Sequence, residues 1–356
     1  MNDITKIISA NAAFKGEFPL EIRNVLKKLC SAAGVSGDEN TAADIALEFL
    51  KEHIPNAQKD KFNNVYGTSI KDEKLPMLLL DAHIDEIGMV VTFIDDKGFI
   101  RIGTCGGHDF RILPAQSVTI WGVEPVKGIV CSIPPHLSKD DKKTVKNDDI
   151  VIDTGYNKEK LLEKISLGDR ITLDSVFSDL QNCRVASRAL DDRAGVTAIL
   201  YALYLLKGKE IEYNLSVLFS SQEEVGSRGA MIAAHRLRPD FAVAVDVSYG
   251  DFPGLPAYDC GKLGDGTMIG ISPCLDREMF EDLKNIARKN KVKHQIEVMG
   301  RSTGTNADNI TVSRGGVRGA LLSIPIRNMH TPVEVAEITD IEATGRLIAD
   351  FCRGGG

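Results

Sequence analysis

The chain of 356 residues has no cysteines in a CxxC spacing, and its seven cysteines are odd in number and scattered. A disulfide framework or a structural zinc site would need paired or closely spaced cysteines. We therefore expect reduced thiols, most of them buried as small apolar side chains, in a cytoplasmic protein.

Long apolar runs are also missing, since none approaches the roughly 20 residues that a membrane-spanning helix requires. The first residues, 1–11, lack the apolar core and cleavage site of a signal peptide, so we expect neither export nor membrane insertion. The net charge of −7 offers no basic surplus. The basic run 139–146 is short and contains Asp, which is typical of a solvated loop, and nucleic-acid binding is not expected.

The composition is that of a globular protein, with 43% hydrophobic and 26% charged residues, and the length allows two domains. Helical periodicity predicts one helix from Ile22 to near Gly34 and another over 39–50. A continuous apolar run at 77–80 predicts a strand that is covered on both faces.

The pattern changes after about residue 86. Short segments rich in Val, Ile and Thr predict a small all-β module with a polar loop at 138–150. Its expected strands are 89–94, 98–102, 117–121, 128–133 and 170–173.

From about residue 183, helices and strands alternate. Helices are predicted at 193–206, 228–236, 277–290 and 333–351, and strands at 214–221, 241–246, 294–299 and 318–324. This alternation predicts an α/β fold, with helices on both faces of a mostly parallel mixed sheet. The β module, 87–176, is then an insertion into a split α/β domain formed by 1–86 and 177–356.

Acidic and imidazole side chains lie near the ends of several predicted strands or just before a helix. They are His83, Asp85, Asp191, Glu223, Glu224, Asp246 and His330. Because ligands in open α/β sheets gather outside the carboxyl ends of the strands, these distant segments can meet in one crevice. Imidazole plus carboxylate suits one or two divalent ions, with zinc favoured and cobalt or manganese as alternatives.

The adjacent pair Glu223 and Glu224 is the most informative feature. Neighbouring carboxylates repel each other, and placing both at the end of a sheet is costly unless cations or protons compensate. One carboxylate can hold a metal while the other moves protons. Asp85 follows His83 by two residues, so it can accept a hydrogen bond from the second ring nitrogen of His83 or steer the substrate.

Each of these residues also has a simpler interpretation. A lone histidine after a strand is more often hydrogen-bonded than metal-bound, and glutamate pairs on surfaces are usually solvated. Asp191 and Asp192 precede a helix and could serve only as N-cap residues. A single match is therefore weak evidence, and only the joint occurrence favours a metal site.

Taken together, these motifs resemble the tetrahedral aminopeptidases, a family that includes glutamyl and deblocking aminopeptidases and some proteins labelled endoglucanase. The motifs are Asp81-Ala-His83-Ile-Asp85-Glu86-Ile-Gly88, Ala189-Leu-Asp191-Asp192-Arg193, Gln222-Glu223-Glu224-Val-Gly226, Val245-Asp246-Val247 and Arg327-Asn-Met-His330. In the β module, the similar segments are Gly106-Gly107-His108-Asp109, Leu113-Pro-Ala-Gln116 and Pro134-Pro135-His136-Leu137. The resemblance covers nearly the whole chain.

The resemblance implies a metal-dependent aminopeptidase that removes N-terminal residues from short peptides, using two divalent ions per subunit. The implied roles are Asp191 as bridging ligand, His83 and Asp246 at one ion, Glu224 and His330 at the other, Glu223 as general base and Asp85 as the partner of His83. It also implies dimers formed through the inserted β domain, six of which make a hollow tetrahedron. That cage would admit only small or unfolded peptides.

The chain departs from the family pattern near the expected substrate pocket. Asn306 and Asn328 stand where Asp and Tyr are common, and Arg188 replaces a more usual Lys. Arg301 or Asn306 could favour acidic substrate side chains. A related deacylase, deacetylase or carboxypeptidase is the alternative enzyme, and a non-catalytic assembly or binding protein is the alternative of another class. An endoglucanase would have no need of the histidines.

Overall fold

The computed structural model describes residues 18–133, 136 and 145–354. Several segments singled out in the sequence fall outside this range. They are the first residues 1–11, the motif residues Pro134, Pro135 and Leu137, and much of the polar loop 138–150.

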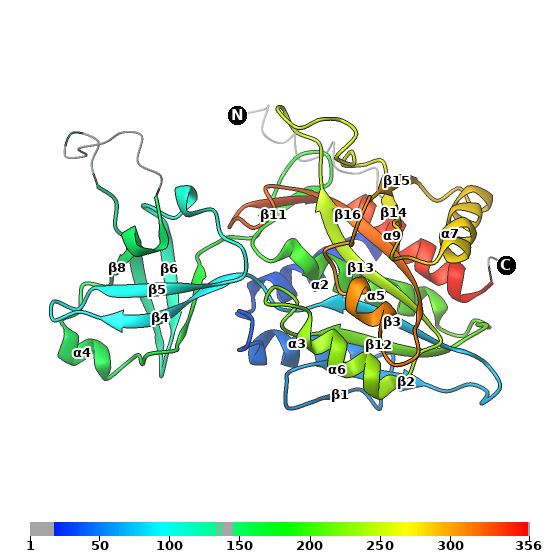
Figure 1. Cartoon of the computed structure of the whole chain (residues 1–356), viewed down its shortest axis with the longest axis horizontal. Helices are drawn as coiled ribbons and strands as arrows, with labels where there is room; N and C mark the ends of the chain where they lie inside the picture. The colour runs from blue at the N-terminus through cyan, green and yellow to red at the C-terminus, as the bar shows by residue number, and fades with distance from the viewer. Residues whose placement is uncertain (1–17, 134–135, 137–144, 355–356) are drawn as a thin grey trace, which may run out of the picture.

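An 11-stranded mixed sheet forms the larger body of the described chain (Figure 1). Its main path runs β1-β2-β12-β3-β13-β16-β17-β11-β10, and β14 and β15 extend it beside β16. The strands are β1 (Gln58–Lys59), β2 (Val65–Ser69), β3 (Met77–His83), β10 (Ser178–Asp179), β11 (Arg184–Ser187), β12 (Asn214–Ser220), β13 (Phe241–Tyr249), β14 (Thr267–Ile271), β15 (His294–Val298), β16 (Arg318–Arg327) and β17 (Glu334–Glu337).

The centre of the sheet is parallel. Strands β12, β3, β13 and β16 run in the same direction, whereas β2 and β17 join the outer sides of this group antiparallel. The carboxyl ends of the four central strands therefore open onto one edge of the sheet, which is where ligands collect in such folds.

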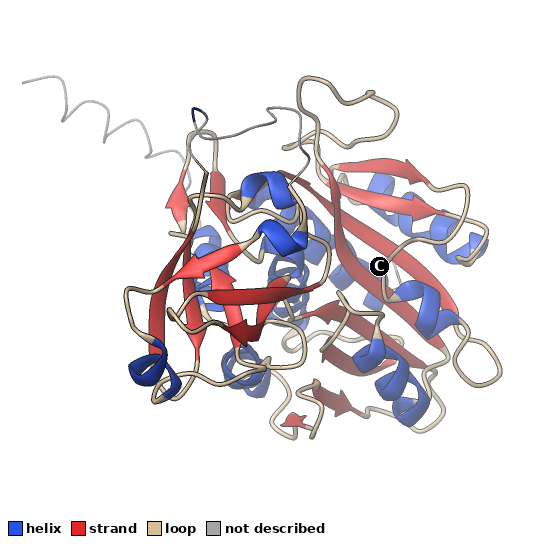
Figure 2. Cartoon of the chain, turned by 60° about the vertical axis from the view of Figure 1, so that its left-hand side comes forward, coloured by secondary structure: helices blue, strands red, loops and turns tan. Residues whose placement is uncertain are grey.

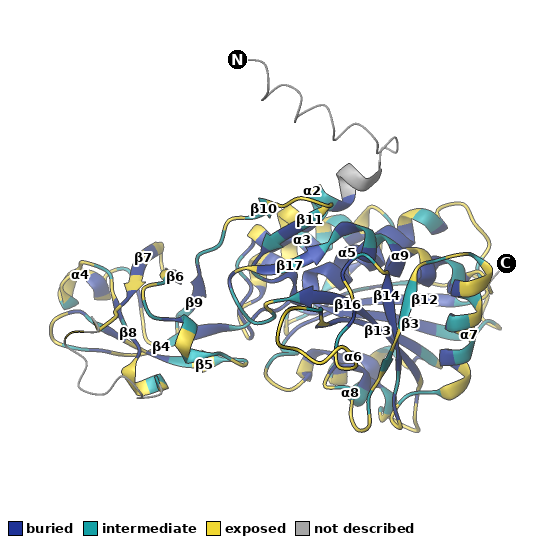
Figure 3. Ribbon diagram, turned by 90° about the horizontal axis from the view of Figure 1, so that it is seen from above, coloured by how far each residue is buried: buried dark blue, intermediate teal, exposed yellow. Residues whose placement is uncertain are grey.

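Helices pack against both faces of the central strands (Figure 2). The helices are α2 (Phe18–Ser31), α3 (Asn40–Lys51), α5 (Leu190–Leu206), α6 (Arg228–Leu237), α7 (Arg277–Lys289), α8 (Ala307–Thr311) and α9 (Ile338–Cys352). Because successive strand residues point to opposite faces, Leu78 and Leu80 join the core under α5 and α9, while Leu79 packs with α6 and α8. This double coverage explains the continuous apolar run at 77–80, and Figure 3 shows these strands buried at the centre of the body.

A separate closed barrel forms the smaller body, at the left of Figure 1. Its strands pair antiparallel in the order β4-β5-β8-β7-β6-β9 around an apolar core of their own. They are β4 (Gly88–Ile94), β5 (Ile100–Cys105), β6 (Ser117–Trp121), β7 (Pro125–Val130), β8 (Val151–Asp153) and β9 (Arg170–Leu173), accompanied by the short helix α4 (Lys158–Leu162) and the 3₁₀ turns η1 (Phe110–Ile112) and η3 (Asn147–Asp149). The predicted mixed α/β sheet with a separate all-β unit is confirmed.

Some predicted elements are wrong in detail. The expected helix 333–351 begins later, as α9 at Ile338, because Glu334–Glu337 pairs with β16 and β11 as strand β17. Its two buried positions are Glu334 and the small residue Ala336, so a strand of four residues carried only a weak alternation signal. The strand expected at 128–133 is β7, Pro125–Val130, three residues earlier. None of the helices in the described part of the chain combines the length and apolar composition needed to cross a membrane.

Candidate metal centre

Five of the predicted residues converge at the carboxyl edge of the parallel strands. His83 ends β3, Asp246 lies in β13, and Asp191 opens α5. Glu224 and His330 follow β12 and β16. They form two groups, His83–Asp191–Asp246 and Asp191–Glu224–His330, and the candidate ligand atoms within each group lie within 4.8 Å of one another.

Asp191 belongs to both groups, and its two oxygens face different histidines. Oδ1 lies 3.0 Å from Nε2 of His83, and Oδ2 lies 3.2 Å from Nε2 of His330. His83 Nε2 is also 3.9 Å from Oδ1 of Asp246, and His330 Nε2 is 3.4 Å from Oε1 of Glu224. Both imidazoles thus direct the same ring nitrogen toward the acidic cluster.

Electrostatics set this cluster apart from ordinary surface carboxylates. Burial, reinforced by the charge of Asp191, raises the pKa values of Glu224 and Asp246 well above their usual range. Burial acts in the same direction on Asp191, but hydrogen bonds with His330 and His83 outweigh it and lower the pKa of that carboxyl. Oε1 of Glu224 is buried and has no hydrogen-bond partner. Bound divalent cations would offset the repulsion among the carboxylates and give Oε1 of Glu224 a partner. The donor set therefore fits such ions.

Asp85 lies behind His83 and is fully buried. Nδ1 of His83, the ring nitrogen that faces away from the cluster, lies 3.2 Å from the backbone carbonyl of Asp85 and 3.4 Å from its Oδ1. The same carboxylate accepts the backbone amides of Glu223 at 3.0 Å and Glu224 at 3.2 Å. One buried carboxylate therefore contacts a histidine and the backbone of both glutamates.

Glu223 is only half-buried and belongs to neither group of candidate ligands. Burial raises its pKa, a shift that the nearby charge of His83 opposes. Its Oε1 accepts a long hydrogen bond of 3.4 Å from the hydroxyl of Ser227. The structure thus separates the two adjacent glutamates, with Glu224 in the cluster and Glu223 beside it.

Glu334 is a site residue that sequence reasoning missed. Its carboxylate is 2% exposed and accepts the backbone amides of Asp191 at 3.1 Å and His330 at 2.9 Å. It therefore holds two of the converging segments together. It lies only four residues after His330, but nothing in the sequence pattern distinguished it from a surface glutamate.

The N-cap interpretation applies to Asp192 and not to Asp191. Asp192 accepts the amide of Gly195 at 3.0 Å and that of His83 at 3.2 Å, and the peptide bond between Asp191 and Asp192 is cis. Left-handed backbone at Ala189, with φ of 58°, precedes this segment, and His330 has φ of 62°. Such conformations are uncommon for residues with a side chain and cluster at functional sites.

The barrel also reaches the centre. A Cβ atom on Gly107 would lie 3.3 Å from Nδ1 of His330, and one on Gly106 would lie 3.3 Å from Cβ of Glu224. His108 bonds through Nε2 to the carbonyl of Gly88, at 2.7 Å. The Gly106-Gly107-His108 segment therefore packs against the two candidate ligands that follow β12 and β16.

The residues that depart from the family pattern lie in different environments. Asn306 is buried, and its side-chain nitrogen donates to Asp81 at 2.9 Å and to Ser220 at 2.8 Å. Asn328 is exposed and donates to the carbonyl of Val333 at 3.2 Å. Arg188 keeps its charge paired with Glu86.

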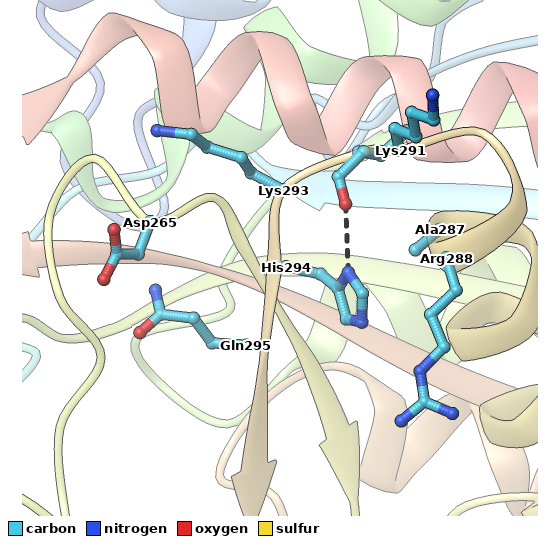
Figure 4. A pocket seen from close by; sticks show the side chains of 8 residues that line it. Asp265, Ala287, Arg288, Lys291, Lys293, His294 and Gln295 are labelled. Atoms are coloured by element: carbon cyan, nitrogen blue, oxygen red, sulfur yellow. Dashed lines mark hydrogen bonds between the residues drawn. The ribbon is translucent and has the colours of Figure 1, made fainter.

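Two cavities differ sharply in character. One of about 20 Å³, room for about one water, is lined by Asp191, Glu224, His108 and Glu334 among others. Another of about 500 Å³ has Arg288, Lys291, Lys293 and Asp265 in its wall (Figure 4). None of the predicted site residues lines the larger cavity, so the larger cavity is not the candidate metal centre.

The profile of a family described as M42 glutamyl aminopeptidase matches residues 63–347. The chain belongs to the M42 aminopeptidase family. This M42 chain is therefore a peptide hydrolase, and the resemblance to tetrahedral aminopeptidases is confirmed.

Among relatives of this M42 enzyme, a lysyl aminopeptidase of Pyrococcus furiosus is 31% identical, over 91% of this chain and 94% of its own. An aminopeptidase from Desulfurococcus kamchatkensis has a similar structure, with a TM-score of 0.89, 30% identity, and coverage of 95% of this chain and 96% of its own. A Pyrococcus horikoshii peptidase that can assemble into a tetrahedron or a large octahedral shell matches with a TM-score of 0.80 and 31% identity, over 93% of this chain and 99% of its own.

Proposed function

We propose that this M42 aminopeptidase removes single residues from the free N-terminus of short peptides, with two divalent ions held at the candidate metal centre. The observation that carries the proposal is Asp191, whose two oxygens each face a different histidine. A carboxylate placed in this way can serve two ions at once. His83 and Asp246 would complete one site, and Glu224 and His330 the other.

The donor set favours zinc, and cobalt or manganese are alternatives. When bound, such ions lower the pKa of a water molecule and polarise a peptide carbonyl. Three carboxylates against two dications leave a residual positive charge, which favours both effects.

Glu223 is the proposed general base. Its carboxylate takes a proton from the attacking water and passes it to the nitrogen of the leaving amine. Burial raises the pKa of this carboxyl toward neutral pH, and a group whose pKa lies near the working pH can both accept and return a proton. Asp85 holds the ring of His83 and the backbone of Glu223 in place.

The proposal is tested with pairs of aminoacyl chromogenic substrates whose α-amine is either free or acetylated. We expect the free substrate to be hydrolysed at least about a hundredfold faster in kcat/KM, because a site built for a charged amine rejects the blocked form. Equal release of the chromophore from both members of each pair would contradict an aminopeptidase, and release of acetate from the acetylated member without the chromophore would indicate a deacylase instead.

We also propose that the chain assembles through its barrel into dimers and that the dimers form a cage in the cytoplasm. Support comes from the shells formed by the Pyrococcus horikoshii peptidase and from the absence of disulfides among the described residues. Native mass spectrometry is expected to show twelve chains. A mass near that of one chain would contradict the assembly and leave the peptidase proposal untouched.

A further inference from the structure

The carboxylate of Asp85 receives four polar contacts, and one comes from a residue outside the predicted site. Oδ1 lies 3.4 Å from Nδ1 of His83 and accepts the amide of Glu223 at 3.0 Å. Oδ2 accepts the amide of Glu224 at 3.2 Å and the hydroxyl of Ser36 at 2.6 Å. The bond from Ser36 is the shortest of the four, as expected for a hydroxyl donating to a charged oxygen.

Ser36 lies in the turn between α2 and α3 and is held on three sides. Its side chain is buried, with 3% of the residue exposed. Its amide donates to the carbonyl of Glu86 at 3.2 Å. Its own carbonyl accepts a bond of 3.2 Å from Nε of Arg170, the first residue of barrel strand β9.

The guanidinium of Arg170 packs closely against the same turn. Gly37 has φ of +84°, and a Cβ atom there would come within 2.9 Å of the Arg170 guanidinium. Glu39, two residues further on, is fully buried and accepts the Gly37 amide. The turn therefore joins the barrel to the buried side of the metal centre.

We propose that Ser36 is a positioning residue for the peptidase reaction: its hydroxyl fixes the rotation of the Asp85 carboxylate and thereby sets the place of Glu223. The inference rests on the proposed role of Glu223 as general base. Ser36 touches neither substrate nor candidate ligand, and it acts only through Asp85.

The physical reason is the unequal strength of the contacts on the two oxygens. Without the hydroxyl, Oδ2 keeps only the 3.2 Å bond from Glu224, and a buried charge loses its best donor. The carboxylate can then turn about its Cβ–Cγ bond, and the 3.0 Å bond to the Glu223 amide lengthens. A displacement of the base by a fraction of an ångström lowers the rate while substrate binding is little affected.

Arg170 extends the same arrangement into the barrel. Its Nε donates to the Ser36 carbonyl, so Arg170 holds the backbone of the serine whose hydroxyl binds Asp85. The barrel strand β9 thus contributes to the geometry of the base, in addition to any part that the barrel has in assembly.

The test compares Ser36→Ala with Ser216→Ala. Ser216 is another buried serine, whose hydroxyl lies 2.9 Å from that of Thr68 in the antiparallel part of the sheet. We expect Ser36→Ala to lower kcat by about tenfold with KM within about twofold, as for outer partners of metal sites. Ser216→Ala is expected to retain the wild-type kcat, and Ser36→Thr to recover most of the loss because it keeps the hydroxyl.

A second measurement does not depend on turnover. The visible absorption spectrum of the cobalt-loaded protein is expected to shift in Ser36→Ala, because Asp85 also contacts His83, while the cobalt content stays at the wild-type value. Arg170→Met is expected to lower kcat by about threefold, and the double variant with Ser36→Ala to lose less than the product of the two effects.

Failure of the inference is distinct from failure of the proposed function. If the wild-type protein hydrolyses substrates and Ser36→Ala matches Ser216→Ala in both kcat and cobalt spectrum, Ser36 is not a positioning residue. If Ser36→Ala does not fold, an unchanged kcat in Arg170→Met would overturn the inference. An inactive cobalt-loaded wild type would instead contradict the proposed function.

Discussion

Replacing Glu223 with Gln is expected to lower kcat by about a thousandfold while the protein keeps its metal. General acid–base catalysis by a single side chain contributes on the order of 10² to 10⁴ in rate. Gln has nearly the same shape as Glu and can still accept the bond from Ser227, but its amide cannot take a proton from water. Metal is retained because Glu223 belongs to neither group of candidate ligands.

The measurement pairs steady-state kinetics with metal content by elemental analysis, and Glu224→Gln is the matched control. That variant has the same chemical change one residue later, at a side chain within the cluster, so it is expected to lose metal as well as activity. If Glu223→Gln instead loses metal and Glu224→Gln retains it, the two glutamates have exchanged roles.

The residues selected from the sequence lie together in one crevice, and a simple rule of sheet architecture explains why. His83, Glu224 and His330 each end or follow a parallel strand, and parallel strands end at one edge of a sheet. Apolar runs show where such strands end, so the crevice could be predicted without any contact information. The assignment of each carboxylate to a role could not, and it came from the family resemblance.

The residues that were missed act through long-range hydrogen bonds. Ser36 is 49 residues from Asp85, and Glu334 is 143 residues from Asp191. The local sequence around Ser36 or Glu334 does not indicate which residue it binds, because a serine in a turn and a glutamate in a short strand are both common. The same limitation hid strand β17, whose buried positions are the acidic Glu334 and the small Ala336.

The contacts of Asn306 could not be predicted from its place in the motif. The segment was expected near the substrate pocket, and in the structure its side-chain nitrogen donates to Asp81 and Ser220. A motif gives the order of residues along the chain but not the direction in which each side chain points.

Removal of metal is expected to abolish hydrolysis altogether. The pKa values of Glu224 and Asp246 are raised well above their usual range by burial and by the charge of Asp191. Without bound cations the carboxyl groups of Glu224 and Asp246 take up protons more readily. No metal ion is then present to polarise the substrate carbonyl. Protein without bound metal should keep its fold, because the apolar cores of both bodies do not involve the cluster.

The most direct test of metal-dependent aminopeptidase activity is hydrolysis of a panel of aminoacyl chromogenic substrates by protein dialysed against a chelator, before and after addition of zinc, cobalt or manganese. We predict no release of any N-terminal residue from the dialysed protein and recovery with at least one of the three metals, while circular dichroism shows the fold unchanged. Undiminished hydrolysis by protein shown to contain no metal, or no hydrolysis of any substrate with any metal, would contradict it.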